Sequence, residues 1–359
     1  MNYSISLLAA VTIDYVPQAL ISLKSARNTC SFSSYYIFVA DALSINVEEI
    51  RVALGEDSSW VKLFGPEELE VEKQKYLQIF NYYNRFEISQ LAKYVGVKFV
   101  LEERLVDVCV FVDADTLFID DVCPLVDEIK NKSVYLTPHL LQPSCDGNEH
   151  EVMIHGWINT GFSAFNKHHY QTKDILDWII NRVSRRAFLA PQLGLSGDQT
   201  WVSVLPILFH RSVKVSLNNG LNVAYWNLDK RCLTRSSNNK ILAGKTPLIM
   251  FHFSGFDETN LIQLSKHSSI PIKMGSILYE LCDIYREKIS HSNKIRVKLN
   301  KITPMPCSKE NLKTRIQICS TYHQIDIYKT MVKSGVFSRV GGLIDSILRK
   351  LLILLSFKA

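Results

Sequence analysis

The chain has 359 residues, of which 47% are hydrophobic and 21% charged, so its composition excludes a disordered or fibrous protein. Its formal net charge of +6 is a mild excess that does not require a nucleic-acid partner. The basic residues gather after Lys288, so an anionic partner would meet the C-terminal end of the chain. The 8 cysteines form no C-x-x-C pair, which argues against a zinc knuckle and favours a reducing, cytoplasmic compartment.

Short apolar runs alternate with longer helical patterns along the chain, which predicts an α/β sheet. The apolar start lacks a basic region, so we expect a buried strand there rather than a signal peptide. The expected strands are Ile5–Val11, Tyr35–Val39, Val108–Val112, Ser133–Leu136, Gly161–Phe165 and Leu248–Phe253. The expected helices are Val16–Ala26, Tyr76–Val95, Lys173–Val183 and Ile277–Ile289.

The regular alternation ends near Asp257, and this sets the expected domain boundary. We expect one α/β domain over residues 1–262 and a basic, mostly helical extension over residues 263–359. Its last segment, residues 336–357, is apolar but interrupted by Asp345, Arg349 and Lys350, so it is a poor membrane span. It fits either an amphipathic helix on an anionic membrane face or a helix packed on the core or on another subunit.

Two carboxylates follow a buried strand in the stretch Val110–Val122. Asp113 and Asp115 are two residues apart, so in an extended chain both side chains point to the same side and can reach one divalent cation. Taken alone, the D-x-D pair also fits a solvated turn after a strand. The tip of a strand in an α/β sheet is nevertheless where such folds bind ligands.

Further stretches occur in a recognisable order around this pair. They are Thr12–Tyr15, Thr137–His139, Gly156–Phe162, Gly197–Trp201, Asn222–Leu228 and Phe251–Phe256. Together with the acidic pair, they make the chain resemble bacterial nucleotide-sugar glycosyltransferases of the GT-A fold, close to the family 8 type, from about Ser6 to Asp257. The resemblance implies a Rossmann-like, nucleotide-diphospho-sugar transferase fold. It also implies transfer of a sugar from a UDP-sugar to a saccharide or lipid-linked saccharide in bacterial surface-glycan synthesis.

The resemblance implies that Asp113, Asp115 and His252 hold Mn²⁺ or Mg²⁺. His252 follows the apolar run Leu248–Phe251 and would also emerge at a strand end, and an imidazole suits Mn²⁺ better than Mg²⁺. The alternative is an ordinary packed histidine. Gly255, three residues on, would let the backbone approach a phosphate.

The sequence departs from the family 8 pattern just after this glycine. Where that family usually continues with Lys-Pro-Trp, this chain reads Asp257-Glu258-Thr259. The usual diphosphate-binding lysine is therefore missing from that place. A basic residue elsewhere, such as Arg85 or Lys245, is expected to replace it.

For the nucleotide, the resemblance places Ala10, Val11, Thr12, Asp14 and Tyr15 around a uracil, with Tyr15 stacking on the ring. Ala114, between the two acidic residues, belongs to the same donor site, and Arg85 points at the donor. Asp14 could instead cap the following helix, and Arg85 could be a solvated surface charge.

For the sugar, the resemblance implies that Asn159 and Gly161 contact the donor and that Asp198 and Gln199 carry the chemistry. Asn159 and Gly161 also fit a plain turn, and Asp198 also fits a helix cap. Trp226 either packs in the core or stacks on an acceptor sugar. His139 and His155 are further candidates for the acceptor site.

The family 8 type implies retention of the anomeric configuration, with the leaving phosphate taking the acceptor proton. Inversion would instead need a carboxylate base such as Asp198 or Asp257. One rival is a sugar nucleotidyltransferase, but Thr12–Gln18 has neither the glycine nor the basic residue expected of its phosphate loop. The other is a non-catalytic scaffold docked at the membrane. The expected location is cytoplasmic, peripheral on the inner face of the membrane.

Overall fold

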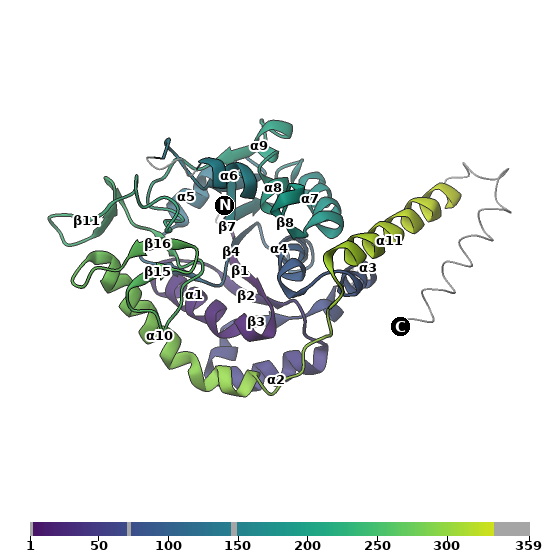
Figure 1. Cartoon of the computed structure of the whole chain (residues 1–359), viewed down its shortest axis with the longest axis horizontal. Helices are drawn as coiled ribbons and strands as arrows, with labels where there is room; N and C mark the ends of the chain where they lie inside the picture. The colour runs from purple at the N-terminus through teal and green to yellow at the C-terminus, as the bar shows by residue number, and fades with distance from the viewer. Residues whose placement is uncertain (1–2, 70–72, 145–148, 334–359) are drawn as a thin grey trace. The chain divides into compact units, whose positions relative to one another are not determined.

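The computed structural model describes residues 3–69, 73–144 and 149–333, and the chain divides into two compact units, Met1–Cys307 and Ser308–Ala359. The first unit is built on a seven-stranded sheet (Figure 1). In spatial order its strands are β10 (Val213–Val215), β6 (Val134–Pro138), β7 (Ile158–Asn166), β4 (Val108–Val112), β1 (Ile5–Val11), β2 (Ser34–Val39) and β3 (Val61–Phe64).

The sheet is mostly parallel, and one inner strand runs against the others. β1 pairs in parallel with β2 and β4, whereas β7 is antiparallel to both β4 and β6. The carboxyl ends of β1 and β4 therefore meet the amino end of β7 at one edge, and the Asp113 N–H donates to the Gly161 carbonyl there at 3.0 Å. This edge is where α/β sheets place their ligands.

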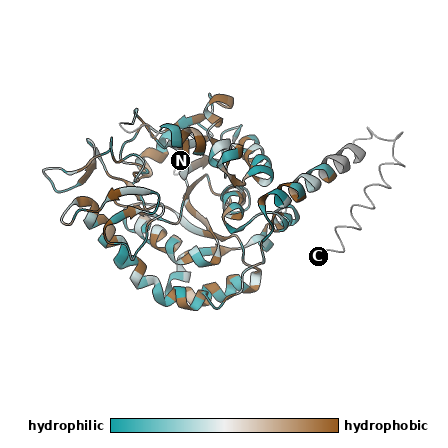
Figure 2. Cartoon of the chain, viewed as in Figure 1, coloured by the Kyte–Doolittle hydropathy of each residue, from teal (hydrophilic) through white to brown (hydrophobic). Residues whose placement is uncertain are grey.

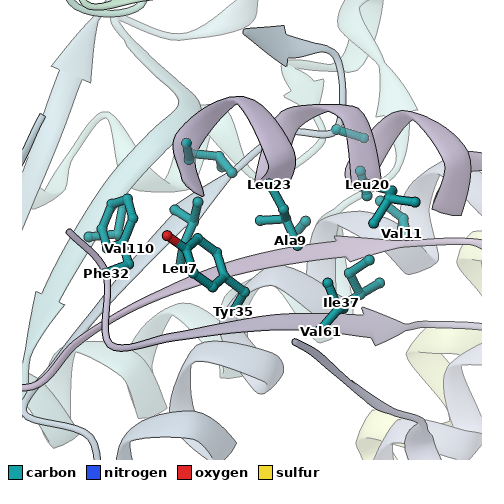
Figure 3. Close-up of a cluster of buried hydrophobic side chains, with 14 of the residues drawn as sticks. Leu7, Ala9, Val11, Leu20, Leu23, Phe32, Tyr35, Ile37, Val61 and Val110 are labelled. Atoms are coloured by element: carbon teal, nitrogen blue, oxygen red, sulfur yellow. The ribbon is translucent and has the colours of Figure 1, made fainter. Parts of the chain in front are cut away.

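Two helices cover opposite faces of the central strands because successive side chains of a strand point to opposite sides. Leu7, Ala9 and Val11 pack under α1 (Val16–Thr29), as Figure 3 shows. On the other face, α4 (Arg85–Glu102) crosses Leu8. Gly96 permits this close approach, since a Cβ there would lie 3.2 Å from the Leu8 side chain.

The helix expected over Tyr76–Val95 is interrupted. α3 (Lys73–Gln78) ends early and α4 begins at Arg85, because Asn84 caps it. The Asn84 side chain accepts the Glu87 N–H at 3.0 Å, and the Glu87 carboxylate accepts the Asn84 N–H at 2.9 Å, which is a capping box. The remaining helices of the first unit are α2 (Ser44–Leu54), α5 (Cys123–Val126), α6 (Glu149–His155), α7 (Thr172–Arg186), α8 (Gln199–Val202), α9 (Leu205–Leu208) and α10 (Ile277–Leu299).

Small antiparallel sheets complete the first unit. The strands are β5 (Thr116–Phe118) with β14 (Met250–His252), β8 (Leu189–Ala190) with β9 (Leu195–Ser196), β15 (Gln263–Ser265) with β16 (Ser268–Pro271), and the trio β11 (Leu233–Arg235), β12 (Ile241–Ala243) and β13 (Thr246–Pro247). The pairing of β5 with β14 matters most for the site, because it sets Thr116 opposite His252.

The division between the units falls after Cys307, whereas the sequence pattern led us to expect a boundary after residue 262. The difference arises because α10 is longer than expected and buries one side in the first unit. Figure 2 shows hydrophobic and hydrophilic residues alternating along it. Its Leu281, Cys282 and Tyr285 join Phe251 and Phe253 in one apolar cluster.

The second unit contains α11 (Leu312–Lys333). The amphipathic segment expected over residues 336–357 lies outside the described residues. Within the part of the chain that the structure describes, no helix is both long and apolar enough to cross a membrane.

Candidate metal and donor site

Three potential metal ligands meet at the ligand-binding edge of the sheet. One oxygen each of Asp113 and Asp115 and one ring nitrogen of His252 all lie within 4.8 Å of one another, the one such group among the described residues. His252 Nε2 is 3.1 Å from Asp115 Oδ1 and 4.0 Å from Asp113 Oδ2. Two backbone links bring them together: β5 pairs with β14, and the Phe253 N–H donates to the Asp115 carbonyl at 2.7 Å.

Asn222 fixes the ring of His252. The Asn222 amide nitrogen donates to Thr137 Oγ1 at 2.9 Å and to Asn159 Oδ1 at 2.8 Å, so its oxygen is left to face His252 Nδ1 at 3.0 Å. Since that oxygen can only accept, His252 Nδ1 carries the proton. Nε2 then faces the two carboxylates, and in the neutral ring its lone pair would be available to a cation shared with them, as in metal-binding histidines.

The charges in the site shift one another's pKa. Burial lowers the pKa of His252, but the Asp115 and Asp113 carboxylates raise it more, so the net shift is upward. Burial raises the pKa of Asp113, and the nearby Lys93 and His252 only partly oppose it. For Asp115, burial is outweighed by His252, and its pKa lies below the usual value.

Lys93 joins Asp113 to Asp198. This buried lysine on α4 places its Nζ 3.1 Å from Asp113 Oδ1 and 3.5 Å from Asp198 Oδ2. Asp198 is fully buried and also accepts the Tyr94 hydroxyl at 2.6 Å and the Thr160 hydroxyl at 3.3 Å. Burial lowers the pKa of Lys93, but Asp113 and Asp198 raise it more, so this ammonium stays charged.

Asn159 and Gln199 are joined in the same network. The Asn159 amide nitrogen donates to Gln199 Oε1 at 3.1 Å, and Asn159 Oδ1 accepts the Gly161 N–H at 2.9 Å. Both Asn159 and Gly161 lie within β7, so the turn expected at this position is wrong. Asp198 is the N-cap residue of α8, as the alternative interpretation expected, but its side chain makes no cap hydrogen bond and instead joins the network around Lys93.

His139 and Trp226 contact this network through Asn159 and His252. The Asn159 amide nitrogen is also 3.1 Å from His139 Nε2, and burial lowers the pKa of His139 to about 3, so its ring is neutral. The Trp226 ring meets both the His139 and the His252 rings edge-on, with centroids 5.3 and 5.2 Å apart. Both side chains are buried, so Trp226 packs against the site.

The residues expected around the base lie at the end of β1. Ala10, Val11 and Thr12 are largely buried, whereas the Tyr15 side chain is 52% exposed. The pKa of Tyr15 is raised by burial and then by the charges of Asp115 and Asp14. Asp14 accepts the Thr12 hydroxyl at 2.6 Å and does not cap α1, whose cap residue is Tyr15.

Arg85 pairs with two acidic residues other than Asp113 and Asp115. Its guanidinium bridges Asp14 at 3.3 Å and Asp41 at 3.0 Å, and Asp41 also accepts the Ile13 N–H at 2.8 Å. Arg85 therefore braces the loop after β1. Burial raises the pKa of Asp41 to about 6, although the Ile13 N–H and Arg85 oppose it.

The structure thus gathers most of the predicted residues at one edge of the sheet. Asp113, Ala114, Asp115, His252, Asn159, Gly161, Asp198 and Gln199 form one connected group. Sequence reasoning missed Lys93 and Asp41 and did not assign Asn222 to the histidine. A lone lysine among the apolar residues of Ile88–Val95 was the available signal for Lys93, since a charge so placed must find a buried partner.

Comparisons with known proteins agree with this architecture. No protein-family model matches the chain. Two uncharacterised Bacillus subtilis proteins are similar: YfnF, 25% identical over 184 residues (50% of this chain and 59% of YfnF), and YfnD, 28% identical over 148 residues (40% of this chain and 45% of YfnD). The chain therefore spans less than two thirds of the length of these curated relatives.

Solved structures are similar over more of the chain. The galactosyltransferase LgtC in complex with donor and acceptor sugar analogues, and an active-site mutant of LgtC, each match with a TM-score of 0.50 and 14% identity. Each match covers 80% of this chain and 95% of LgtC. The likeness shows the fold: the chain has the α/β GT-A fold of glycosyltransferases with a helical C-terminal region.

Proposed function

We propose that the protein is a metal-dependent glycosyltransferase that moves a sugar from a UDP-sugar to a saccharide or lipid-linked saccharide. The observation that carries the proposal is the group Asp113, Asp115 and His252 at the ligand-binding edge of a GT-A fold. Transfer of a hexose, a role in bacterial surface-glycan synthesis and membership of family 8 belong to the same proposal.

The donor set suits a divalent cation. With the carboxylates of Asp113, Asp115 and Asp198 ionised and Lys93 charged, the neutral His252 leaves the group a net charge of −2. Two carboxylates with one imidazole favour Mn²⁺ over Mg²⁺. When bound, the metal would stabilise the charge that develops on the leaving diphosphate.

The surrounding residues hold the donor. Tyr15 is exposed and can stack on a uracil, with Ala10, Val11, Thr12 and Asp14 lining the same end of β1. Asn159 engages the oxygen of the Gln199 amide, so the amide nitrogen is left to face a sugar. Gly255 lies on the chain three residues beyond His252, where its backbone can approach a phosphate.

Retention of the anomeric configuration is favoured because neither candidate base is suited to the task. Asp198 already accepts the Tyr94 and Thr160 hydroxyls and pairs with Lys93. Asp257 accepts the Thr259 hydroxyl and N–H, which lower its pKa. The Asp198 carboxylate is thus occupied by other partners, and the lowered pKa of Asp257 makes it a weak proton acceptor, so the leaving phosphate is left to take the acceptor proton.

The test is titration calorimetry of UDP into the protein with Mn²⁺, without metal, and with the Asp113→Ala/Asp115→Ala double variant. We expect metal-dependent binding that the double variant loses. A folded wild type that binds no UDP would refute the proposal and favour the non-catalytic scaffold. Release of pyrophosphate from a sugar 1-phosphate and UTP would instead identify a nucleotidyltransferase.

The cellular location is part of the proposal. A cytoplasmic enzyme with a lipid-linked acceptor would work at the inner face of the membrane, and the basic C-terminal end is suited to an anionic surface. We expect removal of residues 336–359 to reduce sedimentation with vesicles that contain anionic lipid. Unchanged sedimentation would rule out this role of the segment.

A further inference from the structure

The turn between β15 and β16 folds back onto Gly255. The Lys266 N–H donates to the Gly255 carbonyl at 2.9 Å. Gly255 has a φ of +69°, and a Cβ there would lie 2.5 Å from His267 Cδ2 and 2.6 Å from Ser265 Oγ. Only glycine therefore allows this turn to approach so closely.

Gly255 is itself held beside the metal ligands. Phe253 donates its N–H to the Asp115 carbonyl, and its ring stacks on Tyr285 of α10 with centroids 4.1 Å apart. Phe256 packs against the same tyrosine at 5.4 Å. The segment from His252 to Phe256 is thus held by Asp115 and by Tyr285 of α10. The β15–β16 turn packs on Gly255 within this segment.

Arg85, Lys93 and Lys245 are each engaged with other residues or located in another turn. Arg85 bridges Asp14 and Asp41, and Lys93 lies between Asp113 and Asp198. Lys245 is in the turn between β12 and β13. In contrast, Lys266 and His267 are exposed beside Gly255, and within the described residues the ammonium of Lys266 has no carboxylate partner.

We propose that Lys266 and His267 bind the diphosphate of the donor and take the place of the lysine that the sequence lacks after Gly255. Lys266 supplies a positive charge, and the ring of His267 supplies an N–H donor. A divalent metal neutralises only part of the charge of a nucleoside diphosphate, so a second cation on the other side completes the site. This inference rests on the proposed function.

The experiment measures dissociation constants for UDP and for uridine in the presence of Mn²⁺. We expect Lys266→Gln and His267→Ala each to weaken UDP binding about tenfold, as the loss of a hydrogen bond to a charged group would. Uridine binding should not change, because the base lies at the other end of the ligand. Lys273→Ala, another exposed lysine that follows β16, is the matched control and should leave both constants unchanged.

Two results would overturn the inference. If the wild type binds UDP with Mn²⁺ but Lys266→Gln and His267→Ala bind it equally well, the β15–β16 turn is not the diphosphate site. A loss in Lys245→Ala instead would assign the contact to the β12–β13 turn. If the wild type binds no UDP, the proposed function fails first, so the two failures are distinguishable.

A further variant separates hydrogen bonding by His267 from packing of its ring. His267→Asn keeps an N–H donor, so it should bind UDP more tightly than His267→Ala if the ring donates a hydrogen bond.

Discussion

Gly161 lies directly against the ring of His252. A Cβ at Gly161 would be 2.5 Å from His252 Cε1 and 2.6 Å from Nδ1, closer than van der Waals contact permits. The two residues come from separate strands, Gly161 from β7 and His252 from β14. The absence of a side chain at Gly161 leaves space for the imidazole ring. The glycine of this motif thus leaves space for the His252 ring and lies within a strand, not in a turn.

We predict that Gly161→Ala displaces His252 and weakens metal-dependent UDP binding at least about tenfold, the usual cost of disturbing the surroundings of a metal ligand. Titration calorimetry with and without Mn²⁺ measures this. Binding of uridine provides the internal reference and should be unchanged. A variant that binds UDP and metal like the wild type would show that the ring does not ligate the metal from this position.

Asn222 should act on the metal only through His252. Asn222→Ala removes the acceptor of the Nδ1 proton, so we expect Mn²⁺ affinity to fall about 10- to 100-fold. Asn222 has a φ of +57°, so its replacement by alanine also strains the backbone. Asn239→Ala, at a φ of +65° in an exposed turn, is the matched control. Equal effects of the two variants in metal titrations would contradict the orienting role.

Replacement of Lys93 should destabilise the fold. Lys93→Met leaves the Asp198 carboxylate buried without its cation, and breaking a buried ion pair in this way costs about 3–5 kcal/mol. Urea unfolding measures the change. Lys173→Met, which breaks an exposed pair with Asp177, is the comparison and should cost less than about 1 kcal/mol. Similar losses in the two variants would mean that Lys93 is screened by solvent.

Asp41 should make stability fall as pH rises. Its folded pKa of about 6 lies above the ordinary value of 3.8, so the folded protein keeps a proton that the unfolded chain loses between these pH values. A shift of about two pKa units at roughly 1.4 kcal/mol each corresponds to about 3 kcal/mol lost between pH 4 and 6. Asp41→Asn, which cannot ionise, should escape this loss and gain stability relative to the wild type over the same range.

Unfolding by urea at pH 4, 5, 6 and 7 tests this prediction. Asp107→Asn is the control, because hydrogen bonds from Ser4 and His168 hold the pKa of Asp107 at about 2, and its stability effect therefore lies below pH 4. The Asp107 variant should run parallel to the wild type above pH 4. If the free energy of unfolding of Asp41→Asn also runs parallel to that of the wild type above pH 4, the Asp41 carboxylate is ionised in the folded protein over this whole pH range.

The sequence alone was sufficient where local pattern decides structure. Ile5–Val11 and Val108–Val112 are strands with the expected bounds, because continuous apolar runs of this length have few other ways to be buried. The break between α3 and α4 was missed, since Tyr76–Val95 keeps a helical spacing through Asn84. The capping box at Asn84 and Glu87 was the signal that could have revealed it.

The resemblance to GT-A glycosyltransferases already grouped Asp113, Asp115 and His252 in the sequence, and the structure brings these three side chains together. Which residues surround them was decided by the tertiary structure. Lys93 reaches Asp113 across a helix-to-strand contact, and Asn222 reaches His252 across 30 residues of chain. Such partners are fixed by the distances between elements, and a sequence read one element at a time does not contain those distances.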